Sequence, residues 1–138
     1  MNECVFCKIT AGKIPSDKVY EDEHTIAFLD IRPSNKGHVL VVPKTHYVDV
    51  HAIPEPDLCA ITKTGKRIAD ALQRAVDAEG VNLIMNNGAA AGQIVFHAHL
   101  HVIPRFDGDA VFSPPKRVTY GDGEDAHVAE KIKNALTK

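Results

Sequence analysis

Apolar residues in the first third of the chain occur in short runs separated by polar turns. Such runs, rich in β-branched and aromatic residues, are typical of β-strands. They predict strands over residues 19–21 and 25–31 and over 38–42, where Pro43 ends the run because proline has no N–H for strand pairing. Ahead of them, residues 5–11 favour a short helix that stops before a glycine and a proline.

From residue 56 the spacing of apolar positions changes to three or four, the period of an amphipathic helix. The pattern predicts one long helix over residues 56–79, with Gly80 at its end and Cys59 on its apolar side. Two more strands, an irregular tail and a final short helix follow over residues 81–86, 94–103, 107–123 and 124–136. Strands mixed with one long helix predict an α+β fold in which the helix covers one face of a sheet.

Composition and charge narrow the class of protein. The chain has 138 residues, the length of one domain, and a formal net charge of −2 with lysine and arginine scattered along it. This distribution disfavours a nucleic-acid or membrane surface, but not one bound phosphate. The start lacks a secretory signal, no apolar run reaches the roughly 18 residues of a membrane span, and the three cysteines are an odd number. We therefore expect a reduced, cytoplasmic protein that binds neither nucleic acid nor membrane.

Three histidines alternate with apolar residues in the strand predicted before Pro104. Successive side chains point to opposite faces of a strand, so His97, His99 and His101 would share one face. The intervening apolar residues, from Phe96 onward, would pack under the long helix. Imidazoles, with a reference pKa of about 6.5, are largely neutral at pH 7 and can act as nucleophile, base or metal ligand. The alternative is a partly exposed strand whose histidines have no function.

The run from His97 to Ile103 resembles the motif of the histidine-triad (HIT) family, His-φ-His-φ-His-φ-φ with φ apolar. The resemblance covers about residues 4–105 and points to the Hint-like branch with an N-terminal cysteine pair. Further positions that look like family positions are Phe6, Ile14-Pro15, Tyr20-Glu21-Asp22, Ala27–Ile31, Gly37-His38, Val42–His46, Asn86, Gly88 and Gly92-Gln93. The resemblance implies a single HIT domain over residues 1–138, whose core is followed by a C-terminal tail and short helix over 106–138. It also implies an antiparallel sheet of about five strands with one long helix, extended across a homodimer through that helix and the strand 81–86.

The resemblance further implies a chemistry, the hydrolysis of nucleoside phosphoramidates or related nucleotidyl conjugates, with purines preferred. His99 would attack the α-phosphorus and form a nucleotidyl-histidine that water hydrolyses, so that one difficult displacement becomes two easier ones. A backbone carbonyl would hold the other ring N–H of His99. His38 and His101 would contact the phosphate or set the tautomer, and Asn86 and Gln93 would donate hydrogen bonds to phosphoryl oxygens. The implied catalytic set is His38, His97, His99 and His101.

Nucleotide recognition is implied at a carboxylate and an apolar slot. Asp30 would accept hydrogen bonds from both ribose hydroxyls, although it fits a strand-end cap as well. The slot for the base would consist of Val5, Phe6, Ile9, Phe28 and Ile31, residue types that usually belong to a core. Asn87-Gly88 is equally compatible with a plain turn. Ile94 stands where close relatives carry Ser or Thr, which leaves the leaving group undetermined.

A C-x-x-C pair, Cys4 and Cys7, favours a metal site near the N-terminus. Two thiolates need two more ligands for tetrahedral zinc, and histidine commonly supplies them. A redox pair and coincidence remain alternatives. The resemblance implies His46 and His97 as the other ligands of a structural zinc that the chemistry does not require, with His51 as the alternative to His46.

Other functions fit the same residues. A dinucleoside polyphosphate hydrolase would use the same attack on phosphorus. In a metal-dependent hydrolase, His99 would be a ligand instead of the nucleophile, because His-x-His can chelate zinc. A nucleotide sensor would bind without turnover, and a redox protein would use the cysteine pair.

Overall fold

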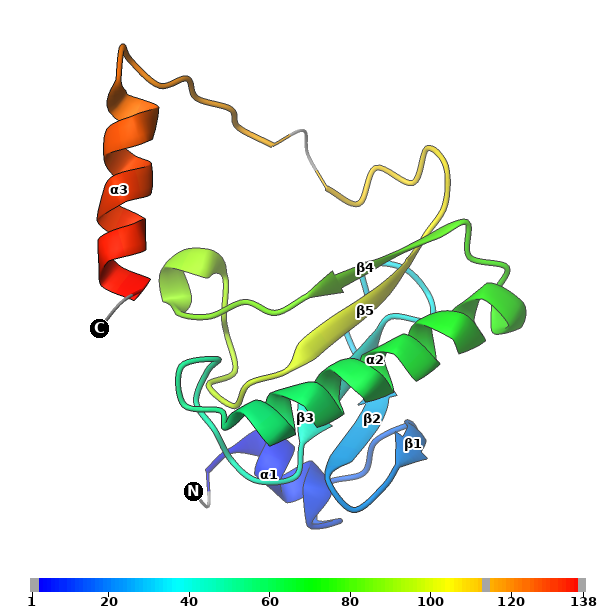
Figure 1. Ribbon diagram of the computed structural model, residues 1–138. Coiled ribbons are helices and arrows are strands. Elements are labelled where there is room, and N and C mark those ends of the chain that lie inside the picture. Colours follow the sequence, from blue (N-terminus) through cyan, green and yellow to red (C-terminus); the bar gives the residue numbers. More distant parts are fainter. Residues whose placement is uncertain (1–2, 113–114, 137–138) are drawn as a thin grey trace.

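The computed structural model describes residues 3–112 and 115–136 (Figure 1). Short elements dominate, and one helix is much longer than the others. In chain order the elements are α1 (Val5–Thr10), β1 (Lys18–Glu21), β2 (Thr25–Leu29), β3 (Val39–Pro43), α2 (Glu55–Ala75), β4 (Gly80–Ile84), the 3₁₀ turn η1 (Ala89–Ala91), β5 (Leu100–Arg105) and α3 (Glu124–Leu136). None of the helices in the described ranges is both long and apolar enough to cross a membrane.

The five strands form one antiparallel sheet in the order β1-β2-β3-β5-β4. After β3 the chain crosses the sheet as α2, returns along the far edge as β4, and then enters between β3 and β4 as β5. Figure 1 shows α2 running across one face of the sheet. The predicted α+β fold with about five antiparallel strands and one long helix is confirmed.

The main core lies between α2 and the sheet. Ile61, Ile68 and Leu72 point from the helix onto Ala27, Val41 and Val102 of the central strands, all of them buried. The helix lies close to the sheet at Gly65, where an added Cβ would stand only 2.6 Å from Cδ2 of Leu100. A polar contact also joins the two layers, because the buried hydroxyls of Thr25 and Thr64 lie 2.8 Å apart.

The opposite face of the sheet is apolar as well. Ile26, Phe28, Leu40 and Val42 alternate with the residues of the main core and form a second cluster, which Phe6 of α1 joins. The expectation of a sheet covered on one face is therefore incomplete. A short helix covers only part of this second face, and the uncovered part lies beside the histidines.

The structure corrects several details of the predicted helix. It ends at Ala75 instead of residue 79, because the chain turns at Asp77, whose φ of 56° no helix continues, and Ala78 then packs into the core. Gly80 begins β4 and does not end the helix. Cys59, expected on the apolar side, is exposed.

The strand predicted over residues 94–103 begins only at Leu100. Pairing between β3 and β5 stops at Val41 and Leu100, because the next position on β3 that would continue the ladder is Pro43, which has no N–H to donate. The carbonyl of Pro43 instead accepts a hydrogen bond from the ring of His97. Phe96, expected under the helix, lies in this irregular segment and is 47% exposed.

We expect Ile61→Ala to lower the free energy of unfolding by about 2–5 kcal/mol, since it opens a cavity between α2 and the sheet where the side chain is fully buried. Urea denaturation followed by circular dichroism measures this change. Ile94→Ala is the matched control, because Ile94 is 86% exposed and its truncation should cost less than about 0.5 kcal/mol. Equal effects of the two substitutions would contradict the packing described here.

Candidate functional site

The three histidines of the motif lie where the irregular segment 94–99 enters β5. His101 is in the strand, whereas His97 and His99 precede it. All three rings lie near the face that α1 covers, since the ring of Phe6 meets those of His97 and His99 edge-on at centroid distances of 5.9 and 5.0 Å. The ring of His99 is also 4.9 Å from that of His101. Phe6 thus packs beside the histidines and limits how far their rings can turn.

His99 is held in one tautomer by its own backbone. Its Nδ1 lies 2.7 Å from the carbonyl oxygen of His97, which can only accept, so Nδ1 carries the proton. The lone pair of the neutral ring is then on Nε2, which has no hydrogen-bond partner among the described residues. Burial lowers the pKa of His99, so the ring is neutral near pH 7. A buried neutral imidazole with a free Nε2 can act as a nucleophile.

A hydrogen-bond chain fixes the tautomers of His38 and His101. The backbone N–H of Ser34 donates to Nδ1 of His38 over 3.0 Å, so the ring proton of His38 is on Nε2. That Nε2 lies 2.9 Å from Nδ1 of His101 and donates to it. The remaining proton of His101 is then on its Nε2, which is left as a donor beside His99.

The environment keeps these rings uncharged. Burial, followed by the neighbouring imidazoles of His99 and His38, lowers the pKa of His101 to about 4. Burial likewise lowers the pKa of His97 to about 4. Burial also lowers the pKa of His38, an effect that the carboxylate of Asp30 opposes. Four clustered imidazoles can stay close together because they are neutral.

A cavity of about 720 Å³ opens beside the histidines, within the size range of small-molecule sites. His38, His99 and His101 line it, together with Asp30 and Asn86. The whole predicted base slot lines it too: Val5, Phe6, Ile9, Phe28 and Ile31. Ile31 is 91% exposed and stands at the margin of the cavity, because β2 already ends at Leu29. The structure thus brings the predicted nucleotide-binding side chains, apart from Gln93, to one cavity.

Gln93 is placed differently. Its amide is buried and bonded within the protein: Nε2 donates to the carbonyls of Val48 and Val95, and Oε1 accepts from the N–H of Gly88. These bonds hold the loop that follows Asn86 against the segment around Val48. Gln93 therefore orders the wall of the cavity and is not among the residues that line it.

Asp30 combines the two roles considered for it. Its Oδ1 accepts the backbone N–H of Arg32 over 2.9 Å, as in a local turn. Its Oδ2 lies 3.6 Å from Nε2 of His38, and the side chain, 19% exposed, lines the cavity. One carboxylate oxygen thus orients the group while the other remains available to a ligand.

Some cavity residues were not anticipated from the sequence. Arg32 and Ser34 line the cavity, and the Ser34 N–H sets the tautomer of His38. In the sequence, the proline and glycine of residues 32–37 predict a loop, and nothing in this segment predicts contact with a ligand. Ile94 lines the cavity with its side chain 86% exposed.

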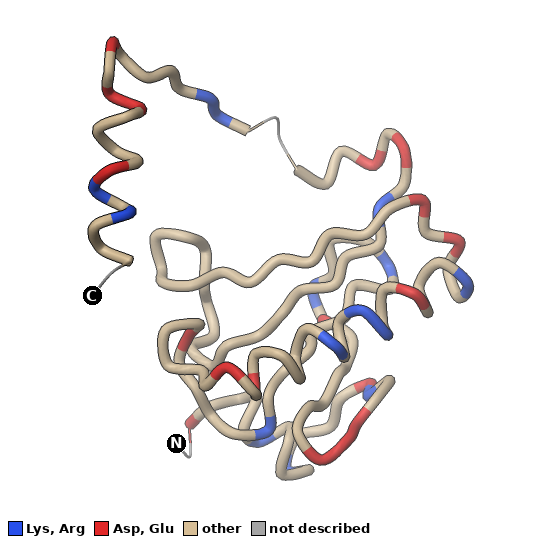
Figure 2. Tube along the Cα trace, in the orientation of Figure 1, with Lys and Arg blue, Asp and Glu red and all other residues tan. Residues whose placement is uncertain are grey.

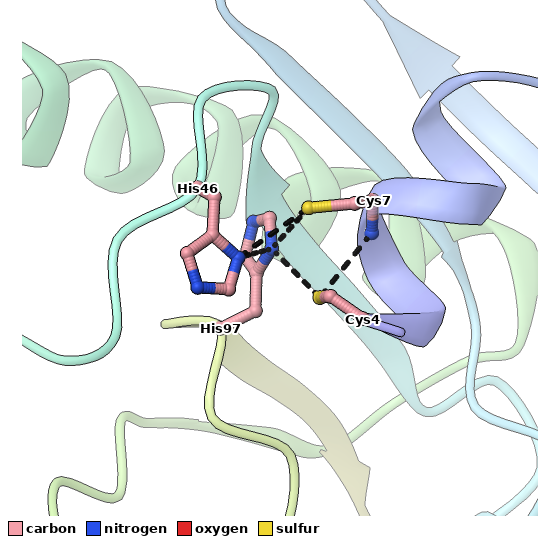
Figure 3. Close-up of side chains that lie close together, drawn as sticks. All are labelled: Cys4, Cys7, His46 and His97. Atoms are coloured by element: carbon pink, nitrogen blue, oxygen red, sulfur yellow. Dashed lines mark hydrogen bonds between the residues drawn. The ribbon is translucent and has the colours of Figure 1, made fainter. Parts of the chain in front are cut away.

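Cys4, Cys7, His46 and His97 form a second cluster, in which the side chains point toward one another (Figure 3). The four ligand atoms all lie within 4.8 Å of one another. Nδ1 of His97 is 3.4 Å from Sγ of Cys4 and 3.1 Å from Nδ1 of His46, and Sγ of Cys7 is 3.4 Å from that same His46 nitrogen. Atoms bound to one tetrahedral zinc stand about 3.3–3.8 Å apart. The two nitrogen–sulfur distances fall in this range and the nitrogen–nitrogen distance lies just below it, so the cluster has the size of a zinc site.

The tautomer of His97 also suits a metal ligand. Its Nε2 donates to the carbonyl of Pro43 over 2.9 Å, which leaves the lone pair on Nδ1, the atom that faces the thiols. Such a second-shell bond commonly orients a histidine ligand. His51, the alternative to His46, is exposed and is not in the cluster.

Asp30, His38 and His101 also place ligand-type atoms close together. Their hydrogen bonds argue against a metal there. The Ser34 N–H occupies the Nδ1 lone pair of His38 and keeps the proton on Nε2, the atom that a cation would need. Asp30, His38 and His101 therefore line the cavity as hydrogen-bonding groups and do not form a metal site.

Comparison with known proteins places these features in context. Residues 11–108 match the HIT domain family. Adenylylsulfatase HINT3 of Arabidopsis thaliana is 41% identical over 112 residues, which are 81% of this chain and 57% of that protein.

Solved structures resemble the whole described fold. A protein from Streptococcus mutans UA159 has a TM-score of 0.93 and 43% identity, with 99% of this chain and 87% of that chain covered. A histidine triad nucleotide-binding protein from Candida albicans has a TM-score of 0.86 and 36% identity over 98% of both chains. A zinc-bound histidine triad family protein from Mycobacterium smegmatis has a TM-score of 0.78 and 38% identity over 99% of both chains.

We expect the His101 imidazole to stay neutral in the folded protein until the pH falls to about 4. The unfolded chain takes up this proton near the ordinary histidine pKa of about 6.5 and therefore binds more protons than the folded chain between the two values. Stability should thus fall as the pH is lowered through this interval. NMR titration of the ring measures the pKa. In thermal unfolding, the Tm of His101→Gln should fall less steeply than that of the wild type as the pH is lowered. Titration of His101 at the ordinary value would contradict the buried, imidazole-lined environment.

Proposed function

This chain belongs to the histidine-triad (HIT) family, and on that premise we propose that it hydrolyses nucleoside phosphoramidates or related nucleotidyl conjugates at the α-phosphorus. The observation that carries the proposal is the hydrogen bond from Nδ1 of His99 to the His97 carbonyl, which leaves Nε2 as the free nitrogen of a ring that lines the cavity. The same cavity holds a carboxylate and an apolar slot, the two features that a nucleoside needs.

The reaction follows from these tautomers. Nε2 of His99 attacks the α-phosphorus and forms a P–N bond, while the bond from phosphorus to the leaving group breaks and the leaving amine takes up a proton from water. The His99 ring becomes positively charged because Nδ1 keeps its proton, and the His97 carbonyl stabilises this charge. Water then attacks phosphorus, the P–N bond breaks, and the nucleotide and the neutral imidazole are regenerated.

Two neighbours are suited to the phosphoryl oxygens. Nε2–H of His101 is a donor beside His99, and the His38 ring with the Ser34 N–H behind it prevents the tautomer of His101 from reversing. The side-chain amide of Asn86, which also lines the cavity, is a second donor. Such preorganised donors stabilise charge that redistributes in the transition state.

Asp30 and the apolar slot supply recognition. The free Oδ2 of Asp30 accepts hydrogen bonds from the ribose hydroxyls, while its Oδ1 stays bound to the Arg32 N–H. Phe6 and Phe28, whose rings meet edge-on at 5.6 Å, offer an apolar surface to a purine base.

Cys4, Cys7, His46 and His97 would hold a structural zinc ion. When bound, zinc would cross-link α1 to the segment before β5 and take no part in the reaction. The cross-link would keep Phe6 against His99 and the carbonyl of His97 in place for the His99 ring. The zinc-bound histidine triad family protein from Mycobacterium smegmatis, 38% identical to this chain, supports the assignment. Thiolate ligands need a reducing setting, so we place the protein in the cytoplasm.

The alternative functions differ in the leaving group on phosphorus, or in whether the bound nucleotide reacts at all. A dinucleoside polyphosphate would use the same attack, and the name of the Arabidopsis relative makes an adenylyl sulfate a further substrate class to test. Ile94 at the cavity offers no hydroxyl to a leaving group. The metal-dependent mechanism is disfavoured, because the His99 ring is hydrogen-bonded to a backbone carbonyl and lies outside the Cys/His cluster.

We also propose a homodimer joined through α2 and the edge strand β4, on which Leu83 is 48% exposed.

We expect His99→Ala to lower kcat/KM for an adenosine 5′-phosphoramidate by about 10³-fold or more, because the covalent step loses its nucleophile. His24→Ala is the control, since that ring is 62% exposed on a turn and is not among the residues that line the cavity. Steady-state turnover of both variants, each shown to be folded by circular dichroism, measures the effect. If wild type and His99→Ala turn over equally, the nucleophile is wrong. If wild type binds nucleotides but turns over none of the three substrate classes, the protein is a sensor.

Cys7→Ser should reduce the zinc content from one ion per chain to a trace and lower Tm by more than about 5 °C, because one of four ligands is lost. Cys59→Ser is the matched control, as this exposed thiol lies outside the cluster. Elemental analysis and thermal unfolding measure both effects. Retention of zinc by Cys7→Ser, or the same loss in Cys59→Ser, would refute the assigned ligands.

A further inference from the structure

The chain continues beyond the sheet as a C-terminal arm, here residues 107–112 and 115–136. Figure 1 shows α3, at the end of this arm, standing apart from α2 and the sheet. None of the described residues of α3 is buried. Its apolar side chains nevertheless recur one turn apart, at Val128, Ile132 and Leu136, and the last two are 57% and 79% exposed. A 13-residue helix is only marginally stable by itself in water, so this stripe indicates a packing partner.

The arm leaves the body in a set direction. The carboxylate of Asp109 accepts hydrogen bonds from Nε and Nη2 of Arg105, from Nδ2 of Asn35 and from two backbone N–H groups of the turn. The guanidinium of Arg105 also lies 5.0 Å from the ring centroid of Phe112. Ala110 adopts a φ of 52°, a strained value for alanine that persists where surrounding contacts hold the backbone. These contacts therefore fix the backbone where the arm leaves the sheet.

The arm has a comparable place in a solved relative. The Streptococcus mutans structure superposes with a TM-score of 0.93 over 99% of this chain. Residues 1–106 are only about three quarters of the chain, and alone they would not reach that score. The arm thus keeps a comparable place in a protein 43% identical, although α3 makes few contacts with the elements of its own body. A packing partner common to both proteins accounts for this. A second copy of the same chain is such a partner.

The charge and length of the arm favour a second copy over other partners. In α3, acidic Glu124, Asp125 and Glu130 are mixed with basic Lys131 and Lys133, which Figure 2 shows along the helix. A helix that binds anionic lipid or nucleic acid would carry a basic face. A stable interface needs about 20–30 residues on each side, and an arm of this length supplies that number when two copies exchange arms symmetrically.

We propose that the C-terminal arm is exchanged between two copies of this chain, with the apolar stripe of α3 packed on the body of the partner. The proposal rests on the homodimer proposed above and adds an interface that α2 and β4 do not form. The partner's body would receive Val128, Ile132 and Leu136 on apolar surface that is exposed in the single chain. Exposed apolar side chains of the body include Val48, Leu83 and Phe96.

Hydrogen–deuterium exchange of the full-length protein, combined with its mass from light scattering, tests the exchange. We expect a two-copy mass and α3 amides that exchange at least about tenfold more slowly than in an unstructured peptide. The double variant Val128→Gln with Ile132→Gln should abolish this protection while α2 stays protected. Glutamine has a higher helix propensity than valine or isoleucine, so a weaker intrinsic helix is not the cause. The control, His127→Gln with Glu130→Gln on the opposite face, should keep the protection.

The outcomes separate the arm from the dimer. A two-copy species with unprotected α3 overturns arm exchange and leaves the proposed α2 and β4 interface standing. A single-copy species with unprotected α3 overturns both. Protection of α3 in a single-copy species means that the arm packs on its own body, and protection that survives in the Val128/Ile132 variant means that the stripe is not the contact. Either of these results also overturns arm exchange.

Discussion

The site depends on one constraint, that a neutral imidazole has a single N–H, so the partner of one nitrogen decides what the other can do. Backbone groups make this choice at three of the histidines. The His97 carbonyl holds Nδ1–H of His99, the Pro43 carbonyl holds Nε2–H of His97, and the Ser34 N–H occupies Nδ1 of His38. Each ring then presents a defined atom: a lone pair toward the cavity at His99, a lone pair toward the thiols at His97, and a donor toward His101 at His38.

The break in β5 makes these assignments possible. A strand that continued through residues 94–99 would use the backbone carbonyls for pairing, and the three imidazoles would stand about 7 Å apart on one face. Because Pro43 cannot extend the ladder, the segment bends, and the carbonyls of Pro43 and His97 become free for side chains. The rings of His99 and His101 then come to a centroid distance of 4.9 Å. The apparent irregularity is what divides the three histidines between two sites.

The two sites share a wall. Phe6 lies between Cys4 and Cys7 in the sequence, and its ring packs against Phe28, His97 and His99. The Cys/His cluster on one side of this ring and the cavity on the other are therefore joined through a six-residue helix. A structural metal in this position would stabilise the geometry around His99 without taking part in a reaction, as proposed here for zinc.

Much of the protein follows from local sequence alone. Alternating and three-to-four-residue apolar spacing determine the strands and helices, and the spacing of His97, His99 and His101, with the family resemblance, indicates the nucleophile, the base slot and the Cys/His ligands. These signals lie in neighbouring residues or in a sequence motif, so they can be recognised without a structure. The place where β5 begins, the internal bonding of Gln93 and the choice of His46 over His51 arise from residues up to 93 positions apart, as between Cys4 and His97. Hydrogen-bond partners at such separations exist only once the sheet has formed, so only the tertiary structure decides which atom of each imidazole is free.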